Sequence, residues 1–557
     1  MRKTKILTIL TLICVLATSC SETLYNNPGT ISDSEEYYED YDIMDKGPVK
    51  GGTLNLFTTR PDTLNPLLTN NSYVSDFLGF IYEGLTKLDK NQKAIGMLSD
   101  SWSVSDDKLM WNFHIRDGVQ WHDGQAFTAY DVEFTIQALL NAGIKTIYKP
   151  LVKNILTCAA VDSSNVKIIL NKPNSFIAEM MTFPILPKHK FSQAGALNTL
   201  EGVEPVGTGP YKYASQNEKG VLLKQNSDWW YLKTQESDNT MYIDNIKINI
   251  YNSKNDAMRA FQTGELDIMS IEQSDIDKYK DRSDVIIKKY PSRDYEFLSF
   301  NLNSAVMSDI YVRKAIKSAI NRDELIDDIL PGSAMAADIP ILNDCWIYEK
   351  NTSASTDKAP VDILLEGGWK KNSQGEFYKT INGSRKYLKV DILVNSSNNT
   401  RVLAAKQICS QLEKAGIAAK YTEVEWNELI NRINSLKYDI ALTGCRVPQI
   451  PDLSYLYSKS YFPTSLPANN QSIGNISGYS NINVDSCIEN MFKFDSEALI
   501  KSNFSQAVQY FNEDIPYVGL YFFSNAMVYS KNVRGIFAPD TWNRYNDFTQ
   551  WYKPEAS

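Results

Sequence analysis

Residues 102–131 read WSVSDDKLMWNFHIRDGVQWHDGQAFTAYD, and this stretch combines two local structures. Apolar and polar residues alternate from 102 to 121, with a turn signal at Asp117-Gly118, which predicts a β-hairpin. Thr128 and Asp131 then have the spacing of a capping box at the start of an apolar helical pattern. We therefore expect a helix over residues 128–140, directly after the hairpin.

Strand and helix patterns also alternate through the rest of the chain. The pattern predicts strands at 52–57, 265–268, 417–421 and 438–442, and helices at 73–85, 256–264, 312–330, 401–415 and 426–436. Gly416 stands where a left-handed residue would end the helix 401–415. The strand–helix–strand succession after residue 401 implies an α/β sheet. No repeat of fixed period and no second linker follows residue 50, so we expect lobes of one compact unit.

Composition excludes several classes of protein. The 557 residues include 57 Lys and Arg against 66 Asp and Glu, a net charge of −9, which argues against nucleic acid as a partner. With 43% hydrophobic and 22% charged residues, the chain has a globular composition. Three histidines in the whole chain argue against a histidine-based zinc enzyme.

The N-terminus has the pattern of an export signal. Arg2, Lys3 and Lys5 precede an apolar run over residues 6–17, which is too short to span a bilayer. Ala17-Thr18-Ser19 leads into Cys20 and resembles the bacterial lipobox, although the third residue before the cysteine is usually Leu. We expect residues 1–19 to be a lipoprotein signal peptide and lipidated Cys20 to anchor the protein to the cell membrane, outside the cytoplasm. The alternative is an ordinary signal peptide with an incidental Cys20.

Residues 20–50 are polar and acidic without an apolar period, which predicts a disordered tether. The five cysteines beyond it are far apart and form no C-x-x-C pair. They are therefore expected to be buried free thiols, with at most one disulfide among them. They are Cys158, Cys345, Cys409, Cys445 and Cys487.

No enzyme signature stands out. The sequence has no H-E-x-x-H, no G-x-S-x-G and no P-loop, and any carboxylate pair chosen from it would be arbitrary. Gly207 and Gly209 form a G-x-G, but Pro210 follows at once, which argues against a dinucleotide loop. We interpret the two glycines as a tight crossing of the chain, with Tyr211 in the core. No catalytic residue, metal site or cofactor is expected.

A series of short motifs follows the order seen in one known family. The motifs are GGTL at 51–54, TLNP at 63–66, YEGL at 82–85, LSDSW at 98–102, RDGV at 116–119, WHDG at 121–124, VGTGPY at 206–211, GELD at 264–267, VRKAI at 312–316, LLEGGW at 364–369 and DIP at 514–516. From Gly51 to about Tyr552 the chain resembles the family 5 extracellular solute-binding proteins. These include the oligopeptide- and dipeptide-binding components of ABC importers.

The resemblance implies an α/β, two-lobed clamshell of the periplasmic-binding-protein type II, in its large peptide-binding class. Lobe I would comprise residues 51–65, 201–300 and 518–557, with an extra domain inserted at 66–200. Lobe II would comprise residues 301–517. Ligand would lie between the lobes, which close over it by a hinge motion.

The resemblance also suggests ligand contacts. In peptide binders of the family, an acidic residue just after the strand matching 438–443 holds the peptide ammonium. Here no acid stands at 447 or 448, Cys445 replaces a common aromatic residue, and Asp452 lies several residues late. Arg446 instead offers a bidentate donor, so a ligand with an anionic or blocked end is a second possibility. A salt bridge to the other lobe is the alternative role for Arg446.

Four aromatic residues complete the expected site. Tyr295, Phe522 and Phe523 match positions that line the cleft in relatives, although each could equally belong to the hinge core. Tyr73 lies in a first-lobe segment that often meets ligand.

The function implied is that of a lipid-anchored, monomeric receptor that captures peptides and delivers them to a permease. Its partners would be transmembrane subunits and cytosolic ATPases, because this chain has no Walker motif. Three alternatives stay open: a peptide sensor without import, a binder of another solute such as a metal chelate or oligosaccharide, and, least favoured, an exported hydrolase.

Overall fold

The computed structural model describes residues 47–193, 195–234, 240–348, 358–461 and 474–554. By its internal contacts the chain forms two units, residues 1–40 and 41–557, and all described residues belong to the second. The predicted signal peptide, Cys20 and residues 21–46 of the predicted tether lie outside the described part. Within that part, no helix combines the length and the apolar character needed to cross a membrane.

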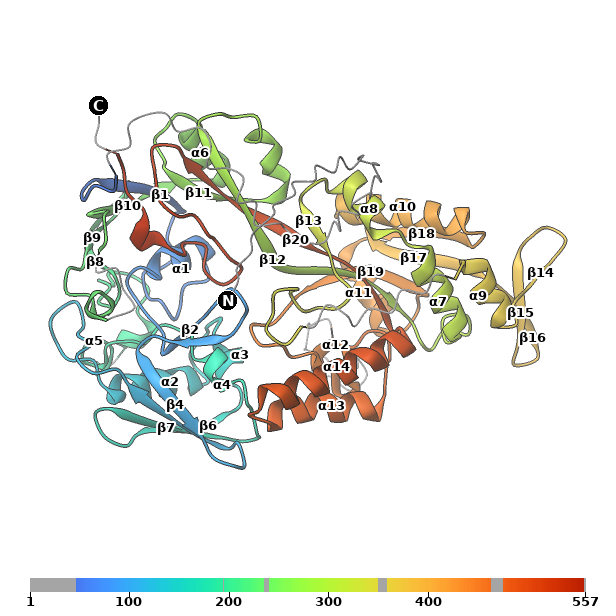
Figure 1. The fold of residues 1–557 in the computed structure, drawn as a ribbon, viewed down its shortest axis with the longest axis horizontal. Coiled ribbons are helices and arrows are strands. Elements are labelled where there is room, and N and C mark those ends of the chain that lie inside the picture. Colours follow the sequence, from blue (N-terminus) through green and yellow to red (C-terminus); the bar gives the residue numbers. More distant parts are fainter. Residues whose placement is uncertain (1–46, 194, 235–239, 349–357, 462–473, 555–557) are drawn as a thin grey trace, which may run out of the picture. The chain divides into compact units, whose positions relative to one another are not determined.

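Two long strands organise the described chain (Figure 1). Strands β12 (Val285–Phe300) and β20 (Tyr517–Ser530) pair antiparallel, with register partners from Val285↔Ser530 to Ser299↔Tyr517. At about 3.3 Å per residue, a strand of 16 residues spans roughly 50 Å. We call β12 and β20 the crossing pair. The pairing shifts between Pro291 and Tyr295, which marks a bulge.

The crossing pair lies at the centre of a seven-stranded sheet with the order β11-β20-β12-β19-β17-β18, in which β13 also pairs with β20. The other strands of this sheet are β11 (Ile268–Ile271), β13 (Ala334–Ala336), β17 (Lys389–Asn395), β18 (Ala418–Val424) and β19 (Ile440–Arg446). Strand β17 runs parallel to both β18 and β19. Helix α11 (Trp426–Asn434) connects β18 to β19, so the predicted α/β succession is confirmed.

Four smaller sheets complete the strands. One four-stranded sheet has the order β1 (Thr53–Thr59), β10 (Asn245–Tyr251), β9 (Gly220–Gln225) and β8 (Tyr211–Asn217). The other four-stranded sheet has the order β4 (Ser99–Val104), β5 (Met110–Ile115), β7 (Asn165–Leu170) and β6 (Ile155–Ala160). A two-stranded sheet pairs β2 (Thr86–Leu88) with β3 (Ala94–Gly96), and a three-stranded sheet has the order β14 (Lys370–Lys371), β15 (Phe377–Ile381) and β16 (Ser384–Tyr387). Strand β1 is parallel to β10, whereas the remaining pairs are antiparallel.

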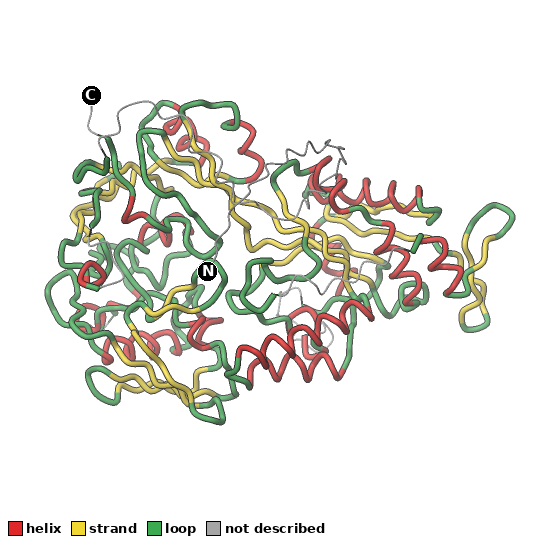
Figure 2. The backbone as a smooth tube through the Cα atoms, viewed as in Figure 1, coloured by secondary structure: helices red, strands yellow, loops and turns green. Residues whose placement is uncertain are grey.

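Helices lie between the strands along the whole described chain (Figure 2). The α-helices are α1 (Ser72–Leu78), α2 (Ala129–Leu140), α3 (Lys149–Val152), α4 (Ile177–Met180), α5 (Lys188–Phe191), α6 (Lys254–Gln262), α7 (Ile310–Ala319), α8 (Arg322–Ile329), α9 (Pro360–Glu366), α10 (Asn399–Lys414), α11, α12 (Ser454–Tyr457), α13 (Ile482–Lys493) and α14 (Glu497–Asp514). The predicted capping box of α2 is confirmed, because Thr128 N donates to Asp131 Oδ2 at 2.9 Å. Gly416 follows α10 with φ of +78°, as predicted for its stop.

The predicted hairpin exists, but its turn was wrongly placed. Strands β4 and β5 pair with Trp102 opposite Phe113, and the turn between them is closed by Lys108 N donating to Ser105 O at 2.9 Å. Asp117-Gly118 belongs to the next loop, which ends in an isolated bridge between Gln120 and Ala126. The turn is therefore the polar run at 105–108. The alternation of apolar and polar residues from 102 to 121 extends across this turn and does not mark its position.

The helix predicted at 73–85 is also wrong in extent, because α1 ends at Leu78. Beyond it, the carbonyl of Phe80 accepts a hydrogen bond from Tyr211 N, and that of Ile81 accepts one from Gly209 N, both at 2.9 Å. A second segment of chain thus uses the backbone groups that a longer helix would need. The apolar period of 73–85 reflects burial in the core, since Tyr211 is 1% exposed.

Residues 312–330 form two helices instead of the single predicted one. Helix α7 ends at Ala319, and α8 begins at Arg322 after Asn321, whose side chain accepts a hydrogen bond from Glu324 N at 3.1 Å. Asn is among the strongest N-cap residues, so a signal for this break was present in the sequence.

The five cysteines outside the N-terminal segment are free, with four buried and Cys445 half-buried. This confirms the expected free thiols, and no disulfide forms within the described part. The predicted segments 51–65 with 201–300, 66–200 and 301–517 each contain their own strands, but contacts join all of residues 41–557 into one unit. The boundaries of the lobes and the inserted domain therefore stay predictions.

The chain crossing at Gly207 gives a test of the fold. A Cβ at Gly207 would lie 1.8 Å from the carbonyl oxygen of Ile81, which is backbone and cannot yield without moving the core. We expect Gly207→Ala to lower the free energy of unfolding by roughly 3 kcal/mol or more in urea denaturation. Gly143→Ala is the control, since a Cβ there meets only the Asn141 side chain at 3.3 Å and should cost within about 0.5 kcal/mol. Equal effects of the two substitutions would contradict the crossing.

Candidate binding site

One cavity among the described residues has a volume of about 420 Å³. Its walls come from α1, the segment between α1 and β3, parts of residues 182–229, and the C-terminal segment 541–548, and Gln449 contributes from the loop after β19. Such a size suits a small organic ligand. The charged side chains in its wall are Asp76, Glu83, Lys87 and Arg544.

An ion pair between Asp76 and Arg544 forms one side of this cavity. Arg544 Nη1 donates to Asp76 Oδ2 at 2.6 Å, and the two side chains are 27% and 22% exposed. Asp76 raises the pKa of Arg544, so the guanidinium stays charged. Within the described residues, Arg544 Nε and Nη2 form no hydrogen bond. Arg544 is thus oriented by one carboxylate and keeps donors for a second, which is the geometry that bidentate carboxylate recognition uses.

Aromatic rings surround this pair. Tyr148, Trp229, Trp542, Tyr545 and Phe548 line the cavity. Trp542 Nε1 is buried and has no hydrogen-bond partner among the described residues. Large apolar surfaces with a few polar groups are typical of ligand pockets.

The predicted site residue Tyr73 lies on α1, one turn before Asp76. Asn71 caps this helix, and its side chain accepts a hydrogen bond from Tyr73 N at 3.1 Å. The ring of Tyr73 packs 4.8 Å from that of Phe57, and burial raises the pKa of its hydroxyl. Tyr73 therefore flanks the cavity without being part of its wall.

Glu83 contributes a buried carboxyl group to the cavity. Its oxygens accept hydrogen bonds from Thr208 Oγ1 at 2.7 Å, Trp230 Nε1 at 2.9 Å and Trp229 Nε1 at 3.1 Å. Burial nevertheless raises the pKa of Glu83 to about 7, although these three donors favour the charged form. The side chain fixes the crossing residue Thr208 and both indoles in place.

Gln449 connects the loop after β19 to the opposite side of the cavity. Its Nε2 donates to Glu179 O at 2.7 Å and to Thr182 Oγ1 at 2.6 Å. The backbone carbonyl oxygen of Gln449 accepts a hydrogen bond from Gln92 Nε2 at 2.8 Å. Three hydrogen bonds therefore join this loop to the predicted inserted domain at the cavity.

Three predicted site residues are neighbours in the seven-stranded sheet. Tyr295 on β12 lies opposite Cys445 on β19 and Phe522 on β20. Tyr295 and Phe522 are almost fully buried, and Tyr295 Oη donates to Asp338 O at 3.1 Å. Cys445 Sγ lies 3.6 Å from the hydroxyl of Tyr455, and burial raises the pKa of its thiol to about 12. A ligand contact for these three residues, and the hinge-core alternative for Tyr295 and Phe522, stay predictions.

The other predicted residues lie apart from the cavity wall. Gly444, Cys445 and Arg446 belong to β19 and not to a loop, as their pairing with β12 requires. Arg446 is 62% exposed, 3.6 Å from Asp294. Asp452 is buried and accepts a hydrogen bond from Ser454 N at 2.9 Å. Phe523 lies on β20 and packs 5.3 Å from Tyr521.

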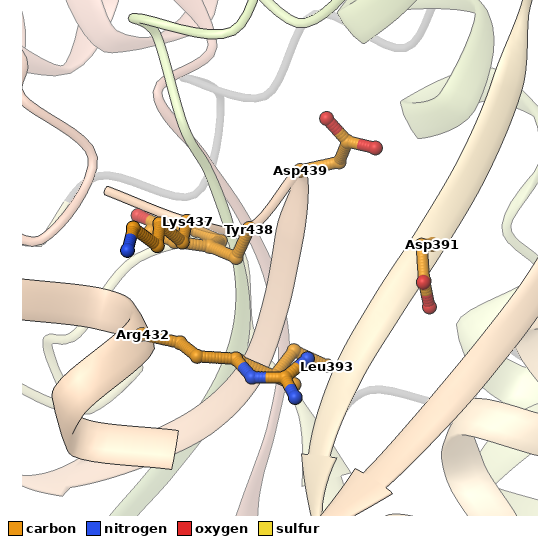
Figure 3. A pocket seen from close by; sticks show the side chains of 6 residues that line it. All are labelled: Asp391, Leu393, Arg432, Lys437, Tyr438 and Asp439. Atoms are coloured by element: carbon orange, nitrogen blue, oxygen red, sulfur yellow. The ribbon is translucent and has the colours of Figure 1, made fainter. Parts of the chain in front are cut away.

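The second cavity, of about 290 Å³, is smaller and more polar. It lies beside the first residues of β19, and Figure 3 shows the carboxylates of Asp391 and Asp439 pointing in different directions. Asp391 accepts from Thr422 Oγ1 at 2.8 Å, and Asp439 from Ser304 Oγ at 2.9 Å. Neither carboxylate is directed to a shared ligand. Among the described residues, no group of three or more His, Cys, Asp or Glu could hold a metal ion.

Sequence reasoning missed Asp76, Arg544 and Gln449. Asp76 and Arg544 are 468 residues apart, and neither lies in a motif that names a ligand. Only the fold brings them together, so no signal in the sequence could have paired them.

The pKa of Glu83 predicts a pH-dependent stability. Because its folded-state value of about 7 exceeds the ordinary value of 4.5, the folded chain binds this proton more tightly than the unfolded chain does. The stabilisation is present in full below pH of about 4.5 and is lost as pH rises through about 7. In urea unfolding, the excess stability of the wild type over Glu83→Gln should therefore shrink between pH 5 and pH 8. The exposed Glu218→Gln is the control, and a Glu83 difference that does not change with pH would contradict the assignment.

The comparisons with known proteins agree with this architecture. The family described as bacterial extracellular solute-binding proteins, family 5 Middle, matches residues 93–465. Oligopeptide-binding protein AppA of Bacillus subtilis (strain 168) is 23% identical over 518 residues, which cover 90% of this chain and 92% of AppA.

Two solved structures are also similar. NikZ from Campylobacter jejuni, in complex with Ni(L-His), is 25% identical with a TM-score of 0.65 and covers 91% of this chain and 100% of its own. HbpA2 from Haemophilus parasuis is 20% identical with a TM-score of 0.75 and covers 89% of this chain and 99% of its own. The predicted α/β, two-lobed clamshell is thereby confirmed. This chain belongs to the bacterial extracellular solute-binding proteins of family 5, and is therefore an extracytoplasmic binding protein of ABC importers, not an enzyme.

Proposed function

We propose that this protein captures peptides in the cavity beside the Asp76–Arg544 pair and delivers them to an ABC permease. The observation that carries the proposal is the guanidinium of Arg544 at the cavity. Its Nη1 donates to Asp76 Oδ2 at 2.6 Å, and its Nε and Nη2 have no hydrogen-bond partner among the described residues. The name of the relative AppA, an oligopeptide-binding protein, supports peptides as the class of ligand.

In this proposal, Arg544 binds the C-terminal carboxylate of the peptide. The aromatic wall accommodates apolar parts of the ligand. Arg446 is a second possible contact for an anionic ligand, with a salt bridge as its alternative role, and it lies 3.6 Å from Asp294. We place the anion-binding role at Arg544 because Arg544 lines the cavity, and a ligand contact at Arg446 stays a prediction.

Capture requires that the cavity close over its ligand. The hydrogen bonds of Gln449 to Glu179, Thr182 and Gln92 join two parts of the chain at the cavity, and they would form only when these parts approach. Ligand bound at Arg544 would favour the closed state by its differential affinity. The closed, loaded protein would then be what the permease subunits, driven by cytosolic ATPases, recognise.

A metal chelate is the second candidate ligand. NikZ is similar to this chain and was solved with Ni(L-His), a complex that contains an amino-acid carboxylate. Arg544 could bind such a carboxylate by the same contact. A peptide sensor that does not import its ligand would use the same cavity, and only the presence of permease partners separates it from the importer component.

Anchoring by a lipid on Cys20 completes the proposal. The basic start, short apolar run and Cys20 support it, although these residues lie outside the described part. The protein would then act as a monomer on the outer face of the cell membrane, linked by residues 20–50.

Arg544 provides the test of the ligand class. We expect Arg544→Gln to weaken binding of peptides with a free C-terminal carboxylate by at least tenfold, since removing a buried charged hydrogen bond costs about 1.5–3 kcal/mol. Isothermal titration calorimetry with a panel of short peptides measures this. C-terminally amidated peptides should bind the wild type and the variant equally.

Arg259→Gln is the matched control for this test. Like Arg544, Arg259 pairs with an aspartate, here Asp256 three residues before it on α6, but Arg259 is 69% exposed and is not part of the cavity wall. It should leave affinity unchanged. An equal loss of amidated and free peptides would show that Arg544 supports the wall and does not bind the carboxylate. If the protein bound Ni(L-His) and none of the peptides, a metal chelate would be the ligand in place of peptides.

Cys20→Ser tests the anchor. Expressed in a bacterium that processes lipoproteins, the wild type should incorporate radiolabelled palmitate and sediment with membranes washed at ~300 mM salt, whereas Cys20→Ser should do neither. Cys14→Ser, within the predicted signal peptide, is the control and should behave as the wild type. Membrane association of Cys20→Ser without label would indicate an uncleaved signal peptide instead.

A further inference from the structure

The three-stranded sheet of β14, β15 and β16 has a charge opposite to that of the chain as a whole. Residues 370–389 contain six basic residues and one acidic residue, whereas the whole chain has a net charge of −9. Figure 1 shows this sheet next to α9, standing clear of the larger sheets. Its edge strand β16 is exposed at all four of its residues.

Strand alternation separates the two faces of this sheet. Phe377 is buried, and Lys379 donates to Asp309 Oδ2 at 2.6 Å, so the face with these residues packs on the rest of the chain. Neighbouring residues point to the opposite face. The register pairs Lys370 with Tyr378, Tyr378 with Tyr387, and Thr380 with Arg385. We call Lys370, Tyr378, Arg385 and Tyr387 the outer face.

Cations and tyrosine rings are interleaved on the outer face. The Arg385 guanidinium lies 4.6 Å from the centre of the Tyr378 ring, and Lys389 Nζ lies 5.9 Å from that of Tyr387. Tyr387 is 39% exposed. In the described part of the chain, Lys370 and Arg385 form no ion pair. Their charge is therefore available to a partner, unlike that of Lys379 or of Lys389, which is 3.5 Å from Glu376.

We propose that the outer face binds the surface of a membrane rich in anionic phospholipids. Lysine and arginine are attracted to anionic headgroups, and tyrosine rings prefer the interface between headgroups and acyl chains. Anionic headgroups repel the net negative charge of the rest of the chain. Electrostatic attraction to the membrane therefore acts on this basic sheet. The contact does not depend on the proposed peptide cavity.

The test is vesicle co-sedimentation of the exported chain from residue 20, with Cys20→Ser so that no lipid is attached. The chain should bind vesicles of phosphatidylcholine with about a third phosphatidylglycerol at ~50 mM salt, and lose this binding near ~300 mM. It should not bind phosphatidylcholine alone. Lys370→Gln/Arg385→Gln should lower the affinity about 25-fold, since each charge near the surface contributes about fivefold.

Two further variants sharpen the test. Lys219→Gln/Lys247→Gln removes two exposed lysines from another sheet and should leave vesicle binding unchanged. Tyr387→Ser should weaken binding to the anionic vesicles at ~50 mM salt, because it removes a ring that inserts between the headgroups. Thermal unfolding and peptide titration of each variant should match the unaltered chain, so that failure of this proposal is distinct from failure of the peptide proposal.

Four outcomes would overturn the proposal. These are equal binding to neutral vesicles, no binding to anionic vesicles at low salt, unchanged binding by Lys370→Gln/Arg385→Gln, and binding of purified permease through these residues without any preference for anionic vesicles. The last result would identify an acidic protein surface as the partner.

Discussion

The antiparallel pairing of β12 and β20 is the constraint on which the rest of the structure depends. Strands β11 and β13 add to β20, and β19 adds to β12, so an error in this register would displace most of the seven-stranded sheet. The register is reinforced by a buried ion pair, since Arg401 on α10 donates to both oxygens of Glu296 on β12. A Cβ at Gly444 on β19 would lie 2.2 Å from Glu296 Oε1, so the pair also requires a glycine there.

A bulge in the crossing pair connects this scaffold to the cavity. At the bulge, the carbonyl of Pro291 accepts a hydrogen bond from Thr541 Oγ1 at 2.8 Å, which holds the C-terminal segment that carries Arg544. Two residues on, Arg293 donates to Val447 O through Nε and Nη2, just before Gln449. Arg293 also lies 5.3 Å from the centre of the Trp542 ring. This irregular region thus holds both the segment with the proposed anion-binding residue Arg544 and the loop whose Gln449 lines the same cavity.

Sequence reasoning succeeded where a local signal and the tertiary structure agree. The capping box of α2 and the stop at Gly416 both follow from rules that involve a few neighbouring residues. It failed where a distant segment decides the outcome. Residues 79–85 have a helical apolar pattern, yet Gly209 and Tyr211 occupy the carbonyls of Ile81 and Phe80. The pairing of Asp76 with Arg544 has no local signal at all, so the seven predicted contact residues include Tyr73 beside the cavity but none in its wall.

The residues that identify the family are largely different from those that would select a ligand. Gly207, Gly209 and Tyr211 make a chain crossing, and Glu83 supports it through Thr208. Their chemistry is the same whatever solute is bound. Arg544, Trp542 and Gln449, in contrast, can change without disturbing that crossing, and they lie on segments outside the recognised motifs. In the proposed site, fold and ligand are therefore encoded by separate residues, which fits one clamshell fold shared by an oligopeptide-binding protein and a protein solved with Ni(L-His).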